Sequence, residues 1–583
     1  MRQSRAAALT IGTLAFGLYL RFVGIPDVFC HSPDEFSEIM PGLRLHALAF
    51  PGLHLPIRYS FLQSMFYSQH GLGDVSLYYL ASAALSGVGL PVSEHWLYVI
   101  GGGVNIALAV AGAAFAAIVI DSALTGWIFA SLVFVSPFYV FVSKTGWARL
   151  SWSPLLFILL LVLQDRALQR PRWIPTALFW LLGAFVALTD AFIMLPIVPV
   201  AAVWATPAGS FRDRVRYLLR SPVFLIGLAL MAAALSVDVV LGVLAHRRHT
   251  DLTMVGYLLL RGATGSWLPR FSSVRTWAAC VDAYLPIRGG WILVAIAFGL
   301  AVRDARRGSP IGIVAAWWAL ASLGVMRYAE AAAPGALNAY YLAPPTFLLL
   351  AWLLSRNPAR VAIAIGAALL VPLAVQAHVA AFDERPRFGV RVEDLVHHTE
   401  MPVSTCRVVK AAAFYIRTHE QGLPFVFHLS SDGWNIYLGH IAEFYDGLSY
   451  GRSSQPEEAN HLFDFAANRF GQQVPPDAFA RAYGIAHFDY YVDFLDEPDR
   501  AHVKPATIAR LERDGARVVC TIRDGGRPIG RIFAFSSVAA TDLDYRDAAA
   551  SWDAMFARAA TLLQQPIAGS AYHFGYNWRT PIF

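Results

Sequence analysis

The sequence predicts a polytopic α-helical membrane domain followed by a soluble α/β domain. Of the 583 residues, 56% are hydrophobic and only 15% are charged, whereas soluble proteins carry about 25% charged residues. The mean hydropathy is +0.48, and the long apolar runs end near Phe382. We therefore expect a membrane domain over residues 1–383 and a soluble domain over residues 384–583.

The apolar runs predict about eleven membrane spans. The first, residues 6–23, reads as an uncleaved anchor, because no small-residue cleavage site follows it. Residues 76–90 are short for a span, so we expect an interfacial helix there, within a first outer loop over residues 25–95. The remaining predicted spans are residues 96–119, 124–142, 153–168, 173–189, 190–206, 221–244, 288–302, 310–326, 339–355 and 360–381.

The distribution of arginine predicts how these spans are oriented. Short cytoplasmic loops collect Lys and Arg, and four arginine-rich loops fall on one side if the apolar runs pair as crossings. The N-terminus is then cytoplasmic and the soluble domain extracytoplasmic, in the plasma (inner) membrane of a bacterium. No basic stripe with interleaved aromatics accompanies the net charge of +6, so we expect no nucleic-acid partner. The four loops are residues 164–172, 211–220, 303–307 and 355–360.

A polar run over residues 31–38 follows the first span and carries Asp34, Glu35 and Glu38. Each acid would cost about 2.5–3.5 kcal/mol at the bilayer centre, so these side chains are expected in or near water at the outer end of the helix. A carboxylate placed there can take a proton from a hydroxyl group. The structural alternative is a solvated loop with a helix N-cap, because Ser32 and Pro33 suit a first turn.

Further short motifs follow the acidic pair in a recognisable order. They are Ser136-Pro137 with Ser143 and Ala148-Arg149, then Gly183 through Leu188-Thr189-Asp190 to Pro196, and finally Arg327 with Tyr340-Tyr341-Leu342 and Pro344-Pro345. With these motifs the chain resembles the polyprenyl-phosphate-sugar-dependent glycosyltransferases of the C-type (GT-C) fold. The most similar branch contains the protein O-mannosyltransferases and the lipid A aminoarabinose transferases. Two departures stand out: Asp190 replaces a lysine, and His54-Leu55-Pro56 only echoes a histidine-proline-proline run.

The resemblance implies an inverting transfer of a sugar from a polyprenyl-phosphate donor to an acceptor hydroxyl on the outer side of the membrane. The acceptor class, a glycan, a lipid or a protein, stays open. Asp34 is the expected base, and Glu35 orients the acceptor, tunes Asp34 or is itself the base. We expect the donor phosphate to be bound by Arg149 and by arginines of a second outer loop (residues 245–288), namely Arg247, Arg248, Arg261 and Arg270. The expected lining of the substrate cavity is His31, Glu38, Arg58, Tyr59, Asp190, Arg327 and Tyr340.

Several of these residues have a structural alternative. Arg149 and Arg327 lie at span boundaries, where an arginine can simply extend to the lipid headgroups. Asp190 can line the site or cap the next helix. No cofactor is expected to be required. A divalent metal stays open, because His31, Asp34, Glu35 and His54 offer ligand atoms without a diagnostic spacing.

Two other classes of function compete with the transferase. A transporter or flippase of a lipid-linked glycan would share the membrane domain, but such proteins often show paired repeats with broken helices at the midplane. The sequence shows no repeat between its halves, and its acids lie at the membrane edge. The second alternative is a non-catalytic assembly or sensor protein, and this class does not explain the acidic residues of the polar first loop.

The soluble domain shows alternating helix and strand patterns. A helix is expected over residues 408–417, and strands over 424–429, 490–494, 517–522 and 531–535. Asp524-Gly525-Gly526 predicts the turn between the last two strands. The four cysteines, Cys30, Cys280, Cys406 and Cys520, all fall on the outer side, where disulfides persist, but their pairing does not follow from the sequence.

Overall fold

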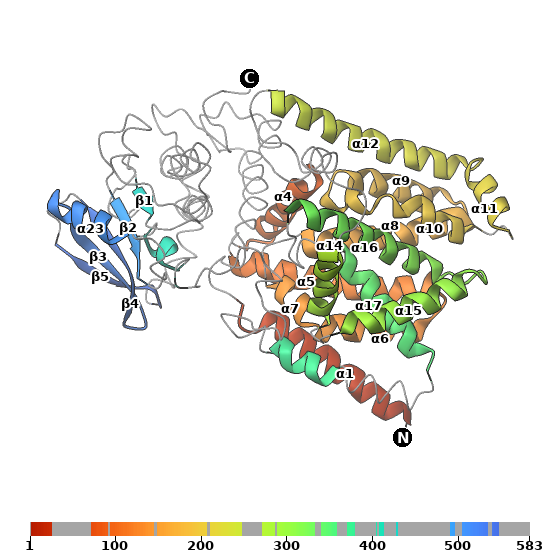
Figure 1. The fold of residues 1–583 in the computed structure, drawn as a ribbon, viewed down its shortest axis with the longest axis horizontal. Coiled ribbons are helices and arrows are strands. Elements are labelled where there is room, and N and C mark those ends of the chain that lie inside the picture. The colour runs from red at the N-terminus through yellow and green to blue at the C-terminus, as the bar shows by residue number, and fades with distance from the viewer. Residues whose placement is uncertain are drawn as a thin grey trace.

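The computed structural model describes the first helix, most of the helical bundle and the sheet of the C-terminal domain. Long apolar and amphipathic segments form the helices, and Figure 1 shows the bundle and the sheet as two separate parts. The described residues are 2–25, 72–90, 94–144, 149–206, 210–247, 271–285, 289–332, 340–357, 370–378, 404, 407–412, 415, 427–429, 490–495, 504–534 and 539–546.

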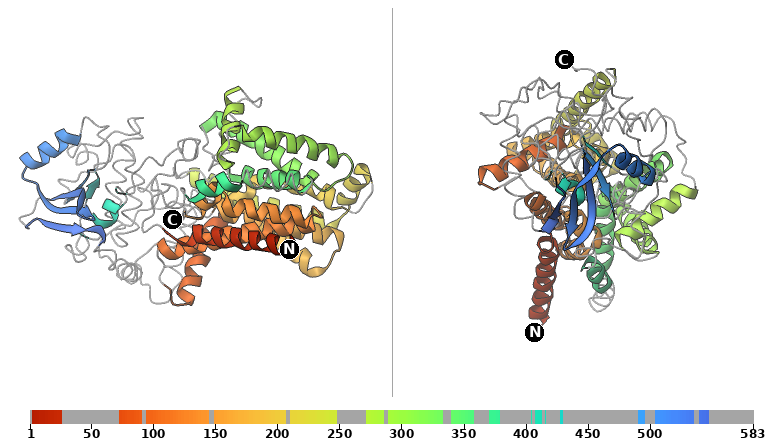
Figure 2. Two further views of the ribbon diagram at one scale, coloured as in Figure 1. Left: turned by 90° about the horizontal axis from the view of Figure 1, so that it is seen from below. Right: turned by 90° about the vertical axis from the view of Figure 1, so that its left-hand side faces the viewer.

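The bundle consists of helices whose long members run roughly parallel to one another (Figure 2). Their bounds agree with most of the predicted apolar runs to within a few residues. They are α1 (Arg2–Phe22), α4 (Leu72–Gly87), α5 (Glu94–Ile118), α6 (Ala123–Val135), α7 (Pro137–Ser143), α8 (Arg149–Gln169), α9 (Trp173–Ala187), the 3₁₀ helix η1 (Asp190–Met194), α10 (Ile197–Ala205), α11 (Phe211–Leu218), α12 (Pro222–Arg247), α14 (Phe271–Tyr284), α15 (Gly290–Ala305), α16 (Gly312–Ala332), the 3₁₀ helix η2 (Tyr340–Leu342) and α17 (Ala343–Ser355).

The length and composition of the described helices do not confirm the predicted number of about eleven membrane spans. Within the described residues, the segments His95–Ile118 and Leu150–Gln169 are long and apolar enough to cross a bilayer. The total rises to four if each of two bent helix pairs counts as one span. The predicted span over residues 124–142 is one of these pairs, because α6 and α7 meet at an angle of 63°. Pro137 explains the bend, since it has no N–H for the helical ladder and its ring clashes with the preceding turn.

Close packing holds the bundle together. A continuous core contains Phe115, Phe129, Phe157 and Trp317, all completely buried. The rings of Phe157 on α8 and Trp317 on α16 meet edge to face, with their centroids 5.1 Å apart, a geometry that favours aromatic pairs. The core therefore joins the first and second halves of the bundle.

The described residues of the four arginine-rich loops lie at one end of the bundle. The Tyr217 hydroxyl on α11 donates to the carbonyl oxygen of Leu168 at the end of α8, at 3.5 Å. Arg356, just after α17, forms an ion pair with Asp304 near the end of α15. Arg214 of α11 and Arg306 line the same cavity, which links the two pairs. The structure thus gathers the loops that the sequence placed together.

The C-terminal domain contains a five-stranded mixed sheet in the order β1-β2-β4-β3-β5. Helix α23 (Lys504–Arg513) packs on it through Leu511, which contacts Tyr491 and Phe533 in one cluster. Residues 407–412 are helical, which overlaps the predicted helix over residues 408–417. Cys520 is a free thiol whose burial raises its pKa to about 11. The strands are β1 (Phe427–Leu429), β2 (Tyr490–Phe494), β3 (Arg517–Asp524), β4 (Arg527–Ala534) and β5 (Thr541–Asp544).

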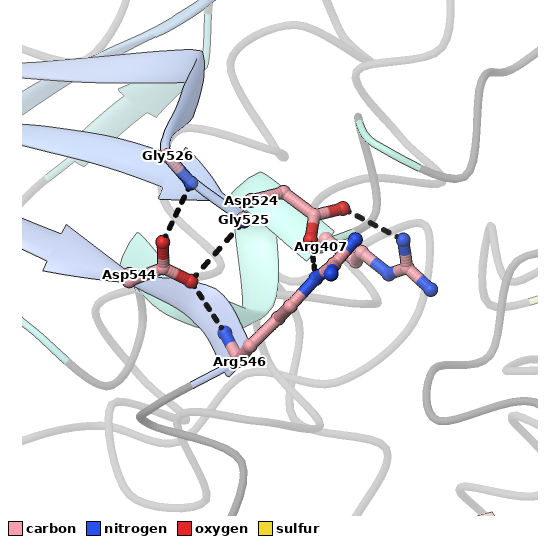
Figure 3. Close-up of polar contacts among 6 residues, drawn as sticks. All are labelled: Arg407, Asp524, Gly525, Gly526, Asp544 and Arg546. Atoms are coloured by element: carbon pink, nitrogen blue, oxygen red, sulfur yellow. Dashed lines mark hydrogen bonds and ion pairs between the residues drawn. The ribbon is translucent and has the colours of Figure 1, made fainter.

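The predicted turn between β3 and β4 is confirmed. Gly525 and Gly526 both have positive φ, 59° and 83°, as a two-residue type I′ hairpin requires. The carboxylate of Asp544 accepts from the backbone N–H groups of Gly525 and Gly526, at 3.3 and 2.9 Å, and from that of Arg546 at 3.0 Å (Figure 3). These hydrogen bonds lower the pKa of Asp544. Asp524 in turn joins Arg546 to Arg407 through its two carboxylate oxygens.

Candidate active site at the end of the bundle

The predicted site residues divide into three groups. The backbone alone is described for Arg149, the first residue of α8, for Arg247, the last of α12, and for Arg327 in the second half of α16. Asp190 and Tyr340 are described with their side chains. The remaining residues lie outside the described part of the chain, so their roles stay predictions: His31, Asp34, Glu35, Glu38, Arg58, Tyr59, Arg248, Arg261 and Arg270.

Helix direction places the described members of this set at one end of the bundle. Helix α8 ends at the arginine-rich loops, so its first residue, Arg149, lies at the opposite end of the bundle. Helix α12 begins beside α11, which is one of the arginine-rich segments, so its last residue, Arg247, also lies at the opposite end. The arginine-rich end also includes Gly312, which places Arg327 towards the opposite end of α16. The described members of the predicted site therefore share the end of the bundle that faces away from the arginine-rich loops.

Asp190 and Tyr340 are brought together at this end. The Tyr340 hydroxyl donates to the backbone carbonyl oxygen of Asp190 at 3.2 Å, across 150 positions of sequence. Both residues are buried. Thr189, rather than Asp190, is the N-cap of η1, because the Thr189 hydroxyl accepts from the N–H of Ala191 at 3.2 Å. The capping alternative for Asp190 therefore does not apply to η1.

Tyr340 belongs to a buried core that also contains Tyr139, Tyr284 and Tyr341. Tyr340 and Tyr341 meet edge to face with their ring centroids 5.7 Å apart. Tyr139 on α7 packs against Phe347 of α17, and Phe138 packs against Tyr284 of α14 at 4.7 Å. Sequence reasoning missed Tyr139 and Tyr284, because only three-dimensional packing connects them with the Tyr340 motif.

Lys144 fixes the end of α1 at this site. Its ammonium nitrogen donates to the carbonyl oxygens of Val23 and Gly24, at 2.8 and 3.1 Å. Val23 and Gly24 directly follow the last residue of α1. A cation at the C-terminal end of a helix also interacts favourably with the helix dipole. The Lys144 side chain is buried. The chain therefore leaves α1 from a fixed point, ten residues before Asp34 in the sequence.

Arg21 holds the same end of α1 through a second set of hydrogen bonds. It is 1% exposed, and its guanidinium donates to the Asn105 amide oxygen at 2.9 and 2.7 Å. It also donates to the carbonyl oxygens of Val133 at 2.9 Å and Phe134 at 3.0 Å, at the end of α6. In a continuous helix, the carbonyl oxygen of Val133 would accept from the backbone N–H of residue 137, but that residue is proline and has no N–H. Arg21 thus supplies the hydrogen bond that Pro137 removes.

A metal centre is not found among the residues that the structure describes, since no group of three or more His, Cys, Asp or Glu side chains gathers there. The ligand candidates named from the sequence, His31, Asp34, Glu35 and His54, lie outside that part of the chain.

Comparison with known proteins adds a fold relationship. No family model and no curated protein matches the sequence. The structure is similar to that of ArnT from Cupriavidus metallidurans bound to undecaprenyl phosphate, with a TM-score of 0.55 and 14% identity, over 92% of this chain and 99% of that one. It is also similar to the apo oligosaccharyltransferase of Archaeoglobus fulgidus, with a TM-score of 0.50 and 12% identity, over 84% of this chain and 69% of that one.

Proposed function

Because the chain has the fold of the C-type glycosyltransferases, as the motifs predicted, we propose that it is an integral-membrane inverting glycosyltransferase. It moves a sugar from a polyprenyl-phosphate donor to an acceptor hydroxyl on the extracytoplasmic side. The observation that carries this proposal is the fold similarity over 92% of the chain, which includes the region beyond the bundle. The acidic pair after the first helix supplies the chemistry that a transferase needs.

In this proposal, Asp34 removes the proton from the acceptor hydroxyl as the acceptor oxygen attacks the anomeric carbon of the sugar. The bond between that carbon and the phosphate oxygen breaks, and polyprenyl phosphate leaves with the negative charge. Glu35 orients the acceptor. General-base catalysis of this kind contributes typically about 10²–10⁴-fold to a rate.

Arginines at the same end of the bundle bind the departing phosphate. The backbone positions of Arg149 and Arg247 support this assignment, since α8 begins and α12 ends at that end of the bundle. Arg248, Arg261 and Arg270 are proposed to join them. A guanidinium group presents a planar fork of donors that stays charged at any working pH, so it neutralises the phosphate as the sugar leaves.

The contact between Asp190 and Tyr340 is consistent with our proposal that both residues help to line the substrate cavity. We assign Asp190, Tyr340 and Arg327 to its wall, together with His31, Glu38, Arg58 and Tyr59. The acceptor is a glycan, a lipid or a protein hydroxyl, and the surrounding bilayer lipid holds the polyprenyl chain. The soluble domain lies on the extracytoplasmic side of a bacterial inner membrane, with the N-terminus in the cytoplasm.

The experiment that tests this function uses the purified full-length protein in lipid vesicles with synthetic polyprenyl-phosphate sugars and envelope extracts as acceptors. Mass spectrometry follows the donor. Release of polyprenyl phosphate together with a glycosylated acceptor supports the transferase. Movement of an intact donor between leaflets, with no covalent change, would instead assign the protein to the transporters and flippases.

A further inference from the structure

An apolar cleft lies at the arginine-rich end of the bundle, away from the candidate active site. It has a volume of about 670 Å³ and lies between α10, α11, α15 and α16. Its walls include Trp204, Phe298 and Val302. In Figure 1, α11 marks this end at the right of the bundle. The volume falls in the range of about 300–1,000 Å³ that is typical of small-molecule sites.

Three arginines line the same cleft. Arg214 comes from α11, whereas Arg306 and Arg307 follow directly after α15. The described lining contains no carboxylate. The neighbouring acid, Asp304, already pairs with Arg303 and Arg356. Among the residues that the structure describes, no carboxylate lies within ion-pair distance of Arg306 or Arg307, so the cleft presents a positive charge beside an apolar wall.

The apolar part of the lining depends on a glycine. Gly312 and Trp204 both line the cleft, and a Cβ atom added at Gly312 would lie 2.5 Å from the Trp204 indole. The ring therefore rests directly on the backbone of α16. This close contact places the large flat surface of the indole in the lining of the cleft, together with the small side chains Ala315, Ala316 and Ala319.

The cleft opens beside a helix that has the character of a membrane-interface helix. Phe211 of α11 is 69% exposed and Leu219, just after it, is 66% exposed. Arg212 and Arg216 are exposed on the same short helix. Exposed apolar side chains beside basic ones are typical of helices that lie at the level of lipid headgroups. A cleft beside such a helix can offer its arginines to a lipid headgroup and its apolar wall to an acyl chain.

We propose that this cleft binds an anionic glycerophospholipid, with its phosphate on Arg214, Arg306 and Arg307 and an acyl chain against Trp204 and Phe298. Charge complementarity selects a negative headgroup, and basic pockets between helices bind such headgroups at the cytoplasmic side of other membrane proteins. A soluble anion would leave the Trp204 wall uncovered. The proposed sugar-transfer reaction takes place at the other end of the bundle, so this inference stands without it.

Native mass spectrometry of the full-length protein tests the proposal. The lipid probes are phosphatidylglycerol, phosphatidylcholine and a polyprenyl phosphate. We expect phosphatidylglycerol to be retained in preference to phosphatidylcholine. The double substitution Arg306→Gln with Arg307→Gln should weaken its retention by about tenfold or more, because charge-assisted bonds to phosphate are among the strongest hydrogen bonds. Arg303→Gln is the matched control, since this exposed arginine lies in the last turn of α15, close to Arg306 in sequence but outside the lining.

A second variant separates lipid binding from folding. Ala316→Phe fills the cleft and leaves every arginine in place, so it should also reduce phosphatidylglycerol retention while the melting temperature stays close to that of the parent protein. Equal retention of phosphatidylcholine, or full retention by both variants, would overturn the proposal. So would preferential binding of polyprenyl phosphate that the Arg306/Arg307 double variant abolishes, because the cleft would then be a site for that lipid.

Discussion

Arg21 hydrogen-bonds the carbonyl oxygen of Val133 at 2.9 Å, across 112 positions of sequence. One guanidinium group thereby donates hydrogen bonds to the carbonyl oxygens at the end of α6 and joins this helix to α1. Because the Asn105 amide oxygen accepts from the same group, three helices meet at a single buried cation. Asn105 also donates to the Ser151 hydroxyl at 3.3 Å, which extends the contact to α8.

We predict that Arg21→Met destabilises the protein strongly. The substitution leaves the oxygens of Val133, Phe134 and Asn105 buried without this donor, and each such group costs about 1–3 kcal/mol. The measurement is the melting temperature in detergent. Arg303→Met is the control, because its exposed ion pair with Asp304 is worth about 0–1 kcal/mol. Equal melting temperatures for the two variants would contradict the role given to Arg21.

We predict that Lys144→Met slows sugar transfer by about tenfold to about a hundredfold, since small displacements of a catalytic group carry costs of that order. Lys144 acts as a positioning residue that holds the end of α1 before Asp34. The expected signature is a lower kcat with little change in KM for the donor, and Lys144→Arg should restore part of the rate. A change in KM alone would show that Lys144 contacts the donor instead.

We predict that Tyr340→Phe costs about 1 kcal/mol of stability, the usual net value of one hydrogen bond. The ring stays and still packs on Tyr341, but the bond to the Asp190 carbonyl is lost. If this contact shapes the cavity, transfer falls by less than it does for a substitution of the base. Chemical denaturation and the transfer assay together measure the two effects. A variant as inactive as Asp34→Asn would mean that the Tyr340 hydroxyl takes part in the chemistry.

We predict that acid weakens the C-terminal sheet through Asp544. Hydrogen bonds from backbone N–H groups lower its pKa in the folded state. Its contribution is therefore fully present above the unfolded pKa of about 3.9 and is lost as pH falls through the lower folded value. Amide hydrogen exchange at Gly525 and Gly526 in the full-length protein, measured from neutral to acid pH, should show loss of protection for the parent. Asp544→Asn should show less protection at neutral pH and a flatter pH dependence.

Local chemistry explains which features could be predicted from the sequence. The turn at Gly525-Gly526 requires positive φ at adjacent residues, and glycine provides this in any context. The apolar runs predicted most helices of the bundle, because the length of an apolar segment depends only on residues that are neighbours in the sequence. The bounds of β3 and β4 differ from prediction by a few residues, since pairing across the turn lengthens both strands.

Long-range contacts explain what could not be predicted. Residues 124–142 read as one apolar run, although Ser136-Pro137 breaks it, and the partner that makes the break tolerable is Arg21. Residues 190–206 likewise read as one span, but the structure divides them into η1 and α10 around Leu195-Pro196. The contact between Asp190 and Tyr340 joins two predicted site residues that no local pattern connects.

The most direct test of the account is the rate of sugar transfer by Asp34→Asn, beside Asp27→Asn as a control in the same loop. The account predicts that Asp34→Asn loses about 10²–10⁴-fold in kcat while expression, melting temperature and donor binding match the parent, and that Asp27→Asn transfers at the parent rate. Parent-like turnover by Asp34→Asn would contradict the assignment of the base.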